Sequence, residues 1–132
     1  MANPEQGPPA GVTPHLMLAD ANAALAFFEA AFDGDVRMKL MADDGKRIMH
    51  CHIVINGGSL MFCDAFPEHG HPAVPPAGYT LHLQVADIDT AWKRAVDAGC
   101  EVIMPVEKMF WGDRYGILKD PNGINWSMGQ SD

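Results

Sequence analysis

The sequence predicts an α+β fold made of two tandem βαβββ modules. Residues 80–87 (TLHLQVAD) repeat residues 13–20 (TPHLMLAD), with five of the eight positions identical. In each copy an alternating apolar segment passes through an Ala-Asp pair into a helical pattern that ends at a glycine, Gly34 or Gly99. Two copies are too few for a solenoid, so we expect paired half-domains that form curved mixed sheets around a cleft.

Length and composition fit one globular domain. The chain has 132 residues, of which 48% are hydrophobic and 20% charged. No apolar run is long enough to span a bilayer, and the start of the chain lacks the pattern of a secretion signal, so we expect a cytoplasmic protein with no membrane partner. The net charge of −8 argues against a nucleic-acid partner and weakly favours a cationic ligand. Three cysteines without C-x-x-C spacing predict reduced thiols.

The first module is predicted over residues 12–64, after a loose, proline-rich arm at residues 1–11. A strand over residues 12–18 places alternate side chains on opposite faces, and one face is formed by Thr13, His15 and Met17. Asp20 or Asn22 caps the following helix. The helix buries an apolar stripe of Leu25, Phe28 and Phe32.

Three more strands complete the first module. Residues 36–41 and 48–55 flank a turn with Asp44-Gly45, which is typical of a hairpin, and residues 59–63 follow a second turn rich in glycine. The segment 65–78 is then a proline-rich linker, longer than most connections, which crosses between modules or covers a site. Its two histidines are expected to be exposed and to have no role.

The second module is predicted over residues 79–129 in the same order. Its expected elements are a strand at 79–85, a helix at 88–98, and strands at 101–104, 117–119 and 124–128. Proline breaks the third of these segments at position 105. We expect Ala91, Ala95 and Val96 to face inward from the helix.

In its repeated order of strand, helix and three strands, the chain resembles the vicinal-oxygen-chelate superfamily, which includes glyoxalases, bleomycin-resistance proteins and extradiol dioxygenases. The resemblance covers about residues 12–129. The pieces MHCHIVINGGSLMFCD, LHLQVADIDTA and WGDRYGILKDPNGINWSM resemble its PhnB-like branch, often labelled 3-demethylubiquinone methyltransferase-like. The resemblance implies a homodimer with a small-molecule ligand in the cleft between the modules.

In metalloenzymes of this superfamily, the first strand of each copy and a carboxylate on the last strand of each copy hold the metal. Here the corresponding positions are Thr13, Thr80, Ser127 and a residue near Phe62. Hydroxyl groups are poor ligands for zinc, nickel or iron. We therefore predict no catalytic metal and no other cofactor.

The alternative is a divalent metal (Zn, Ni, Mn or Fe) held by His15 and His82, which occupy equivalent places in the repeat. A displaced third ligand would come from another nearby side chain: His50, His52, Cys63 or Asp64. The two histidines could instead act as general acid and base, or form hydrogen bonds in a pocket or core. Cys63 on its own is expected to be inert.

Aromatic and guanidinium groups near the end of the chain suit an aromatic or anionic ligand group. Trp111 and Arg114 lie in one loop, and Trp126 follows it. Equally, Arg114 could pair with Asp113 or Asp120, and Trp126 could fill the core. The complete predicted pocket is Thr13, His15, Met17, His50, His52, Thr80, His82, Trp111, Arg114 and Trp126, and some of the nine methionines would line it.

These features predict a protein that binds a small organic molecule, such as a cationic antibiotic sequestered as bleomycin-resistance proteins do. The alternative is a metal-dependent lyase or dioxygenase of glyoxalase type. A methyltransferase is the least favoured reading because no G-x-G-x-x-G loop follows a strand.

Overall fold

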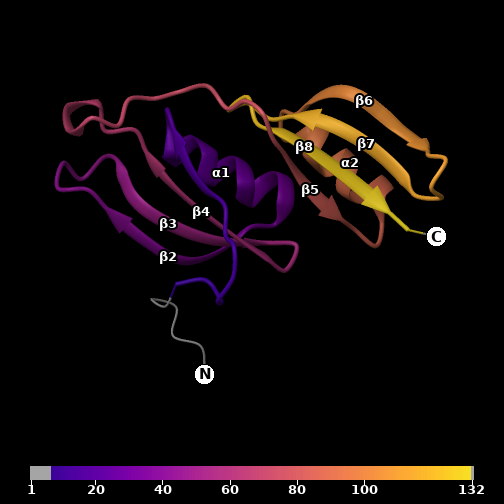
Figure 1. Ribbon diagram of the computed structural model, residues 1–132, viewed down its shortest axis with the longest axis horizontal. Helices are drawn as coiled ribbons and strands as arrows, with labels where there is room; N and C mark the ends of the chain where they lie inside the picture. The colour runs from indigo at the N-terminus through magenta and orange to yellow at the C-terminus, as the bar shows by residue number, and fades with distance from the viewer. Residues whose placement is uncertain (1–6, 132) are drawn as a thin grey trace. The chain divides into compact units, whose positions relative to one another are not determined.

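Two four-stranded mixed sheets, each with one helix, make up the computed structural model, which describes residues 7–131 (Figure 1). The strand orders are β1-β4-β3-β2 and β5-β8-β7-β6. In each sheet the first and last strands of the module pair in parallel, and the remaining pairs are antiparallel. This arrangement confirms the predicted α+β fold of two βαβββ modules with curved, open sheets.

The elements follow the predicted order. The first module contains β1 (His15–Leu18), α1 (Ala21–Phe32), β2 (Asp35–Met41), β3 (Ile48–Ile55), β4 (Gly58–Asp64) and the short 3₁₀ helix η1 (Pro67–His69). The second contains β5 (Thr80–Gln84), α2 (Ile88–Asp97), β6 (Glu101–Lys108), β7 (Arg114–Lys119) and β8 (Asn125–Gln130).

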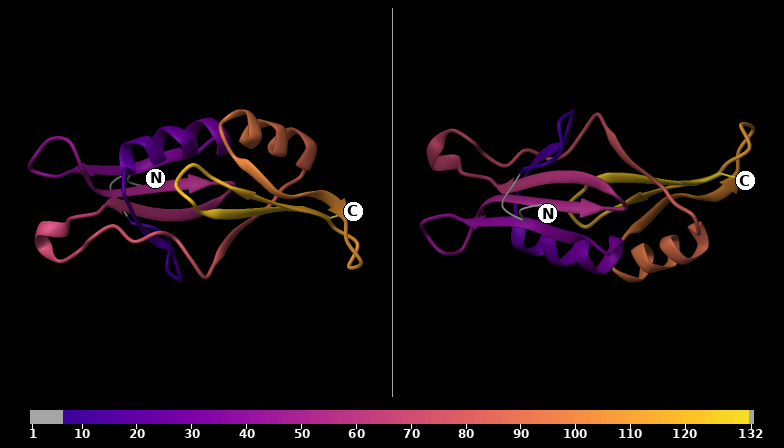
Figure 2. Two further views of the ribbon diagram at one scale, coloured as in Figure 1. Left: turned by 90° about the horizontal axis from the view of Figure 1, so that it is seen from above. Right: turned by 90° about the horizontal axis from the view of Figure 1, so that it is seen from below.

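The chain divides into two compact units at Val74 and Pro75, except that Ala30–Phe32 group with the second unit. Each helix lies against one face of a sheet (Figure 2). Of the arm predicted over residues 1–11, residues 1–6 lie outside the described residues, and residues 7–11 contain neither helix nor strand. The first strand begins at His15, three residues later than predicted. No helix within residues 7–131 is long and apolar enough to cross a membrane.

Helix α1 is capped by a side-chain hydrogen bond at its N-terminus and by a left-handed residue at its C-terminus. Asp20 is the N-cap, with extended backbone, and its carboxylate accepts the Ala23 N–H at 3.1 Å. The left-handed residue at the other end is Asp33, one position before the predicted stop at Gly34. Gly34 is needed for a different reason, because a Cβ atom there would collide with the side chain of Ile53.

The helical stripe predicted from the spacing of apolar residues is buried. Leu25 and Phe28 are 7% and 0% exposed, and the Phe28 ring meets the Phe62 ring edge to face with centroids 5.4 Å apart. Residues of β1 alternate as predicted: Leu16 and Leu18 are buried, whereas His15 and Met17 are exposed. The apolar core of the first module therefore lies between α1 and one face of its sheet.

The prediction that Pro105 breaks its strand was wrong. Strand β6 continues from Glu101 to Lys108, although its pairing with β7 shifts register around Met104. The proline is tolerated because β6 is at the edge of its sheet and has a strand partner on one side only. Pro105 also falls within the register shift between Met104 and Glu107, where the pairing with β7 is irregular.

Strand β7 carries a glycine that lets an indole ring approach closely. A Cβ atom on Gly116 would stand 2.6 Å from a ring carbon of Trp92 and 3.1 Å from the Met104 carbonyl oxygen. We expect Gly116→Val to lower the free energy of unfolding by about 2 kcal/mol or more through overpacking. Urea unfolding measures this, with Gly58→Val as the matched control, because a Cβ atom at Gly58 meets only ordinary contacts. Equal stability of the two variants would contradict the close packing at Gly116.

Candidate functional site

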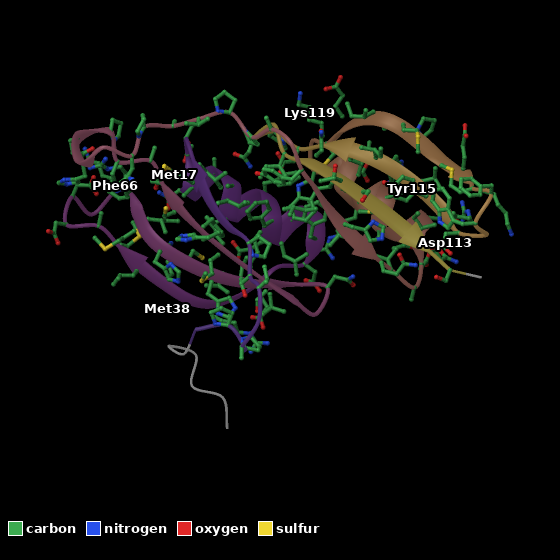
Figure 3. All side chains as sticks on the ribbon, in the orientation of Figure 1. Met17, Met38, Phe66, Asp113, Tyr115 and Lys119 are labelled. Carbon is green, nitrogen blue, oxygen red and sulfur yellow. The ribbon has the colours of Figure 1, made fainter. Side chains whose placement is uncertain are left out.

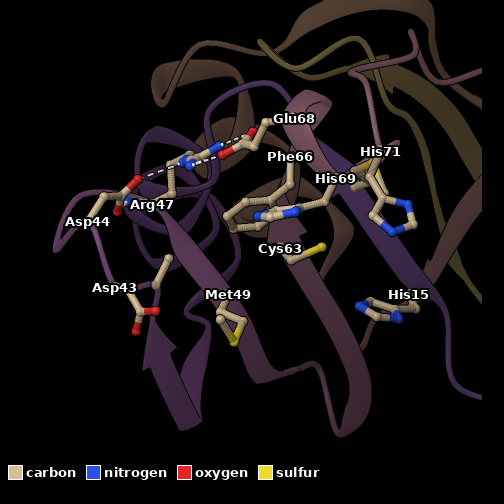
Figure 4. A pocket seen from close by; sticks show the side chains of 12 residues that line it. His15, Asp43, Asp44, Arg47, Met49, Cys63, Phe66, Glu68, His69 and His71 are labelled. Carbon is tan, nitrogen blue, oxygen red and sulfur yellow. Dashed lines mark hydrogen bonds and ion pairs between the residues drawn. The ribbon is translucent and has the colours of Figure 1, made fainter.

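A cavity of about 630 Å³ lies in the first module, where one end of the sheet meets the segment after β4 (Figure 4). Side chains from β1, β3 and β4 form one wall. Those from the β2–β3 turn and from residues 66–71 form the rest. The lining residues are His15, Met17, Ala42, Asp43, Asp44, Arg47, Met49, Cys63, Phe66, Glu68, His69 and His71.

The segment 66–71 is a closed loop rather than an open linker. The Phe66 N–H donates to the His71 carbonyl at 2.7 Å, and the His71 N–H donates back to the Phe66 carbonyl at 3.0 Å. Between them Gly70 takes a left-handed conformation, with φ of 81°, which favours glycine. The loop holds His69 and His71 at the cavity, whereas their place in a proline-rich linker predicts no role for either.

The Arg47 side chain connects the 66–71 loop to the β2–β3 turn through hydrogen bonds. Its guanidinium donates two hydrogen bonds to Glu68, at 3.0 and 2.5 Å, and a third to Asp44 at 2.7 Å (Figure 4). The guanidinium carbon also lies 4.3 Å from the centre of the Phe66 ring. One side chain therefore joins the β2–β3 turn to the loop that closes the cavity.

The charges around the cavity are predominantly negative. It has three carboxylates, Asp43, Asp44 and Glu68, and one guanidinium. Hydrogen bonds from Arg47 lower the pKa of Glu68 to about 2. Backbone N–H groups of Arg47 and Lys46 are the main cause that lowers the pKa of Asp44 to about 2. Because these groups stay ionised at neutral pH, the cavity favours a cation.

Three histidines gather on the open face of the first sheet, the face away from α1. The rings of His15 and His50 meet edge to face, with centroids 5.8 Å apart. The nearby His52 is buried, and its Nε2 lies 2.9 Å from the Ser59 hydroxyl. Burial first, and then the two neighbouring imidazoles, lower the pKa of His50 below its ordinary value. His50 therefore tends to be neutral.

In the second module His82 is held by hydrogen bonds on both ring nitrogens. Its Nδ1 lies 2.7 Å from the Ser127 hydroxyl, and its Nε2 lies 2.8 Å from Gln84 Oε1. The Gln84 amide nitrogen donates to Asp113 and Ser131, so its oxygen faces the imidazole and Nε2 carries the proton. With the proton on Nε2, Nδ1 accepts a hydrogen bond from the Ser127 hydroxyl.

Aromatic rings extend the surface around His82. The Tyr115 ring stacks on the imidazole, with centroids 5.9 Å apart and planes 20° apart. Trp111, half of whose surface is exposed, meets Tyr115 edge to face at 5.7 Å. Tyr115 and Asp113 lie at the same end of the second sheet (Figure 3). Thr80 is exposed at the start of β5.

The other two predicted ligand residues of the second module have structural partners. Arg114 forms a fork with Asp89, with N–O distances of 3.0 and 2.8 Å, rather than with either aspartate expected from the sequence. Trp126 is 2% exposed and donates its indole N–H to Asp120 at 2.8 Å. The Arg114 fork links β7 to the first turn of α2.

The positions that hold a divalent metal in related enzymes do not fit one here. The Ser127 hydroxyl is buried and engaged with His82. Phe62 is fully buried, facing α1 rather than the open face of the sheet. Thr13 and Thr80 offer only hydroxyl groups. In the described part of the chain, no three His, Cys, Asp or Glu side chains are grouped to hold a metal.

The structure thus brings several predicted pocket residues together within each module. His15 and Met17 line the first-module cavity, His50 and His52 lie on the adjoining open face, and His82 and Trp111 share the second-module surface. As ligand contacts all ten residues remain predictions. Sequence reasoning missed Arg47, Phe66 and Glu68, since nothing in their spacing indicates that they meet.

The chain folds as two βαβββ modules, each a four-stranded mixed sheet with one helix. The family model of the Glyoxalase/Bleomycin resistance protein/Dioxygenase superfamily matches residues 12–128. The chain belongs to this superfamily.

Similar chains occur in mycobacteria and among solved structures. Uncharacterized protein Mb0911c of Mycobacterium bovis is 38% identical over 125 residues, which cover 90% of this chain and 82% of that protein. TioX from Micromonospora sp. ML1 superposes with a TM-score of 0.72 and 23% identity, covering 92% of this chain and all of TioX. The PhnB protein from Bacillus cereus gives 0.71 and 21%, with coverage of 91% and 98%. At these identities the two structures show the shared fold alone.

Proposed function

We propose that this superfamily member binds a small organic molecule, and that the first-module cavity receives an aromatic, cationic part of it. The cavity itself is the observation that carries the proposal. Its volume, about 630 Å³, falls within the range of drug-sized ligand sites. Its walls combine an aromatic ring, thioethers and carboxylates in excess over cationic groups.

Each part of the wall suits one property of such a ligand. Phe66 and the tilted His69 ring, with centroids 6.5 Å apart, offer flat surfaces for an aromatic group. Met17 and Met49 are flexible and adapt to irregular apolar shapes. Asp43 adds a carboxylate beyond the two that pair with Arg47. A positive charge near this carboxylate would be stabilised, whereas an anion would be repelled.

Binding of a fluorescent aromatic cation, berberine, tests the proposal directly. We expect berberine to bind, with the aromatic anion ANS binding more weakly, and Phe66→Ala to reduce berberine affinity at least about tenfold through lost stacking. Asp43→Asn should weaken berberine binding several-fold. The matched control is Asp35→Asn, which removes the same charge from β2 away from the cavity.

The outcomes of these measurements distinguish binding at the cavity carboxylate from nonspecific binding of berberine to the protein. If Asp43→Asn and Asp35→Asn reduced berberine affinity equally, the net charge of the protein, and not the position of Asp43, would determine the affinity. Preference for ANS, or binding that survives Phe66→Ala, would contradict the assignment of the cavity. Circular dichroism checks that each variant is folded.

The finer placement of the chain is also a proposal. The WGDRYG and DPNGINW motifs support the PhnB-like branch, and the hydroxyl groups at the usual ligand positions support a function without the usual catalytic metal. A lyase or dioxygenase of glyoxalase type would need different ligands there. We further propose a cytoplasmic homodimer, and light scattering of the purified protein tests the dimer.

A further inference from the structure

The first-module cavity has a different chemical character at each of its two ends. Its lining crosses the sheet from His15 on β1, through Cys63 on β4 and Met49 on β3, to the turn that joins β2 and β3. Figure 4 shows His15 and His71 on one side of the cavity and the aspartates of the turn on the other. The cavity therefore has an imidazole end and a carboxylate end.

The order of the strands sets the distance between these ends. Strand β4 separates β1 from β3, and neighbouring strands are about 4.8 Å apart, so β1 and β3 are roughly 10 Å apart. Burial, more than the charge of Asp64, raises the pKa of the Cys63 thiol, so this thiol on β4 is uncharged at neutral pH. A ligand that reaches both ends must therefore be an elongated, fused-ring molecule with an apolar middle.

The imidazole end has hydrogen-bonding capacity that the protein itself does not use. Within residues 7–131, the ring nitrogens of His15 and His71 form no hydrogen bond with another residue. His82, at the equivalent place in the second module, has both ring nitrogens engaged, by Ser127 and Gln84. The same position in the repeat is thus held by the protein in one module and open to a ligand in the other.

Two imidazoles at one end suit a particular ligand group. A neutral imidazole has one N–H donor and one nitrogen acceptor. A phenolic hydroxyl donates one hydrogen bond and accepts another, so one ring can accept its O–H while the other ring donates to its oxygen. A methoxyl group can only accept, and it would leave one of these two contacts unmade.

We propose that the ligand of this cavity is an elongated aromatic cation with a hydroxyl group on a terminal ring, and that His15 and His71 bind this hydroxyl. The hydroxyl donates to one imidazole and accepts the N–H of the other, while the positive charge of the ligand lies toward Asp43. The inference rests on the proposed function, because it names the ligand class of the same cavity.

Two alkaloids, palmatine and jatrorrhizine, test the hydroxyl alone. Both are planar cations with the fused rings of berberine, and they differ in one group on a terminal ring, which is a methoxyl in palmatine and a hydroxyl in jatrorrhizine. Fluorescence titration should show that the wild-type protein binds jatrorrhizine about fivefold more tightly than palmatine, as expected for one additional hydrogen bond.

His15→Phe and His71→Phe each keep a flat ring but remove its nitrogens. We expect each variant to lower the preference for jatrorrhizine, and the double variant to abolish it. The readout is the ratio of the two affinities, so a change in cavity shape that affects both alkaloids equally cancels. The matched control is His82→Phe, which removes the equivalent imidazole outside the cavity and should keep the full preference.

Nitrogen NMR of the histidine rings gives a second readout that needs no variant. Jatrorrhizine should shift the ring-nitrogen resonances of His15 and His71 more than palmatine does, because only the hydroxyl can donate to an imidazole. This measurement decides the question if circular dichroism shows that a variant is unfolded.

Equal binding of the two alkaloids by the wild type would overturn the assignment of the hydroxyl. A preference that survives the double variant, or is lost in His82→Phe, would contradict it as well. Berberine binding that depends on Phe66 would leave the proposed function in place in each of these cases. If berberine, palmatine and jatrorrhizine all fail to bind, the proposed function and this inference are both wrong.

Discussion

Replacing Asp64 by alanine is expected to lower the free energy of unfolding by about 3 to 5 kcal/mol. The side chain is 4% exposed at the end of β4. One carboxylate oxygen accepts the Ala21 N–H and the other accepts the Ile48 N–H, both at 2.7 Å. Alanine would leave two buried donors without a partner.

The effect is large because one side chain joins three elements. Ala21 is the first residue of α1, and Ile48 is the first residue of β3. The N–H at the start of a helix has no partner within the helix, so it depends on a group such as Asp64. Asp64→Asn keeps one carbonyl oxygen and should lose only part of the stability.

Urea unfolding of the three proteins measures this order: wild type, then Asp64→Asn, then Asp64→Ala. The matched control is Asp97→Ala, which removes an exposed carboxylate that pairs with Lys93 on the surface of α2. The control should change little, because exposed ion pairs contribute little. A similar loss in the control and in Asp64→Ala would contradict the role of the buried hydrogen bonds.

Removing the Arg47 side chain is expected to free the 66–71 loop. Arg47→Ala deletes the ion pairs with Asp44 and Glu68 and the contact with the Phe66 ring. Only the backbone hydrogen bonds within residues 66–71, among them the mutual pair of Phe66 and His71, then remain to hold the loop in the described structure. We expect the hydrogen-exchange protection of these two amides to fall at least about tenfold, while the amides of β3 stay protected.

Arg37→Ala is the control for this change, because Arg37 forms a surface pair with Asp35 and does not reach the loop. Unchanged protection at Phe66 and His71 in Arg47→Ala would show that the loop does not depend on the guanidinium. The berberine affinity of Arg47→Ala then shows whether ligand binding in the cavity requires an ordered loop.

The ion pairs of Arg47 with Asp44 and Glu68 predict that the order of the 66–71 loop depends on pH. Folding lowers the pKa of Asp44 from 3.8 to about 2 and that of Glu68 from 4.5 to about 2. A lowered carboxyl pKa means that the stabilisation is complete above the ordinary value and is lost as the pH falls toward about 2. Loop protection, corrected for the intrinsic exchange rate, should thus hold at pH 5 and decline below about pH 4. Loss of protection between pH 7 and pH 5 would contradict this assignment.

Much of the fold was predictable because it repeats and alternates. The matched segments at residues 13–20 and 80–87 indicated two modules, and the alternation around Leu16 and Leu18 indicated which face of β1 is buried. These are local patterns that one strand or helix imposes on its own sequence. Pro105 misled the prediction because the cost of a proline depends on whether its strand is at an edge, which is a property of the whole sheet.

The candidate site was less predictable because it depends on distant contacts. Arg47 and Glu68 are 21 residues apart, and no periodicity connects them. In the sequence His69 and His71 are ordinary linker residues, and only the backbone hydrogen bonds between Phe66 and His71 show that they belong to a closed loop. In contrast, the face shared by His50 and His52 followed directly from their spacing on a strand.

The measurement that tests the central claim most directly is NMR mapping of berberine on the labelled protein. Our account predicts that the amide shifts that change most belong to β1, β3, the β2–β3 turn and the 66–71 loop, with saturation at one ligand per chain. Largest changes confined to β5–β8, or no saturable change, would contradict the assignment of the first-module cavity as the ligand site.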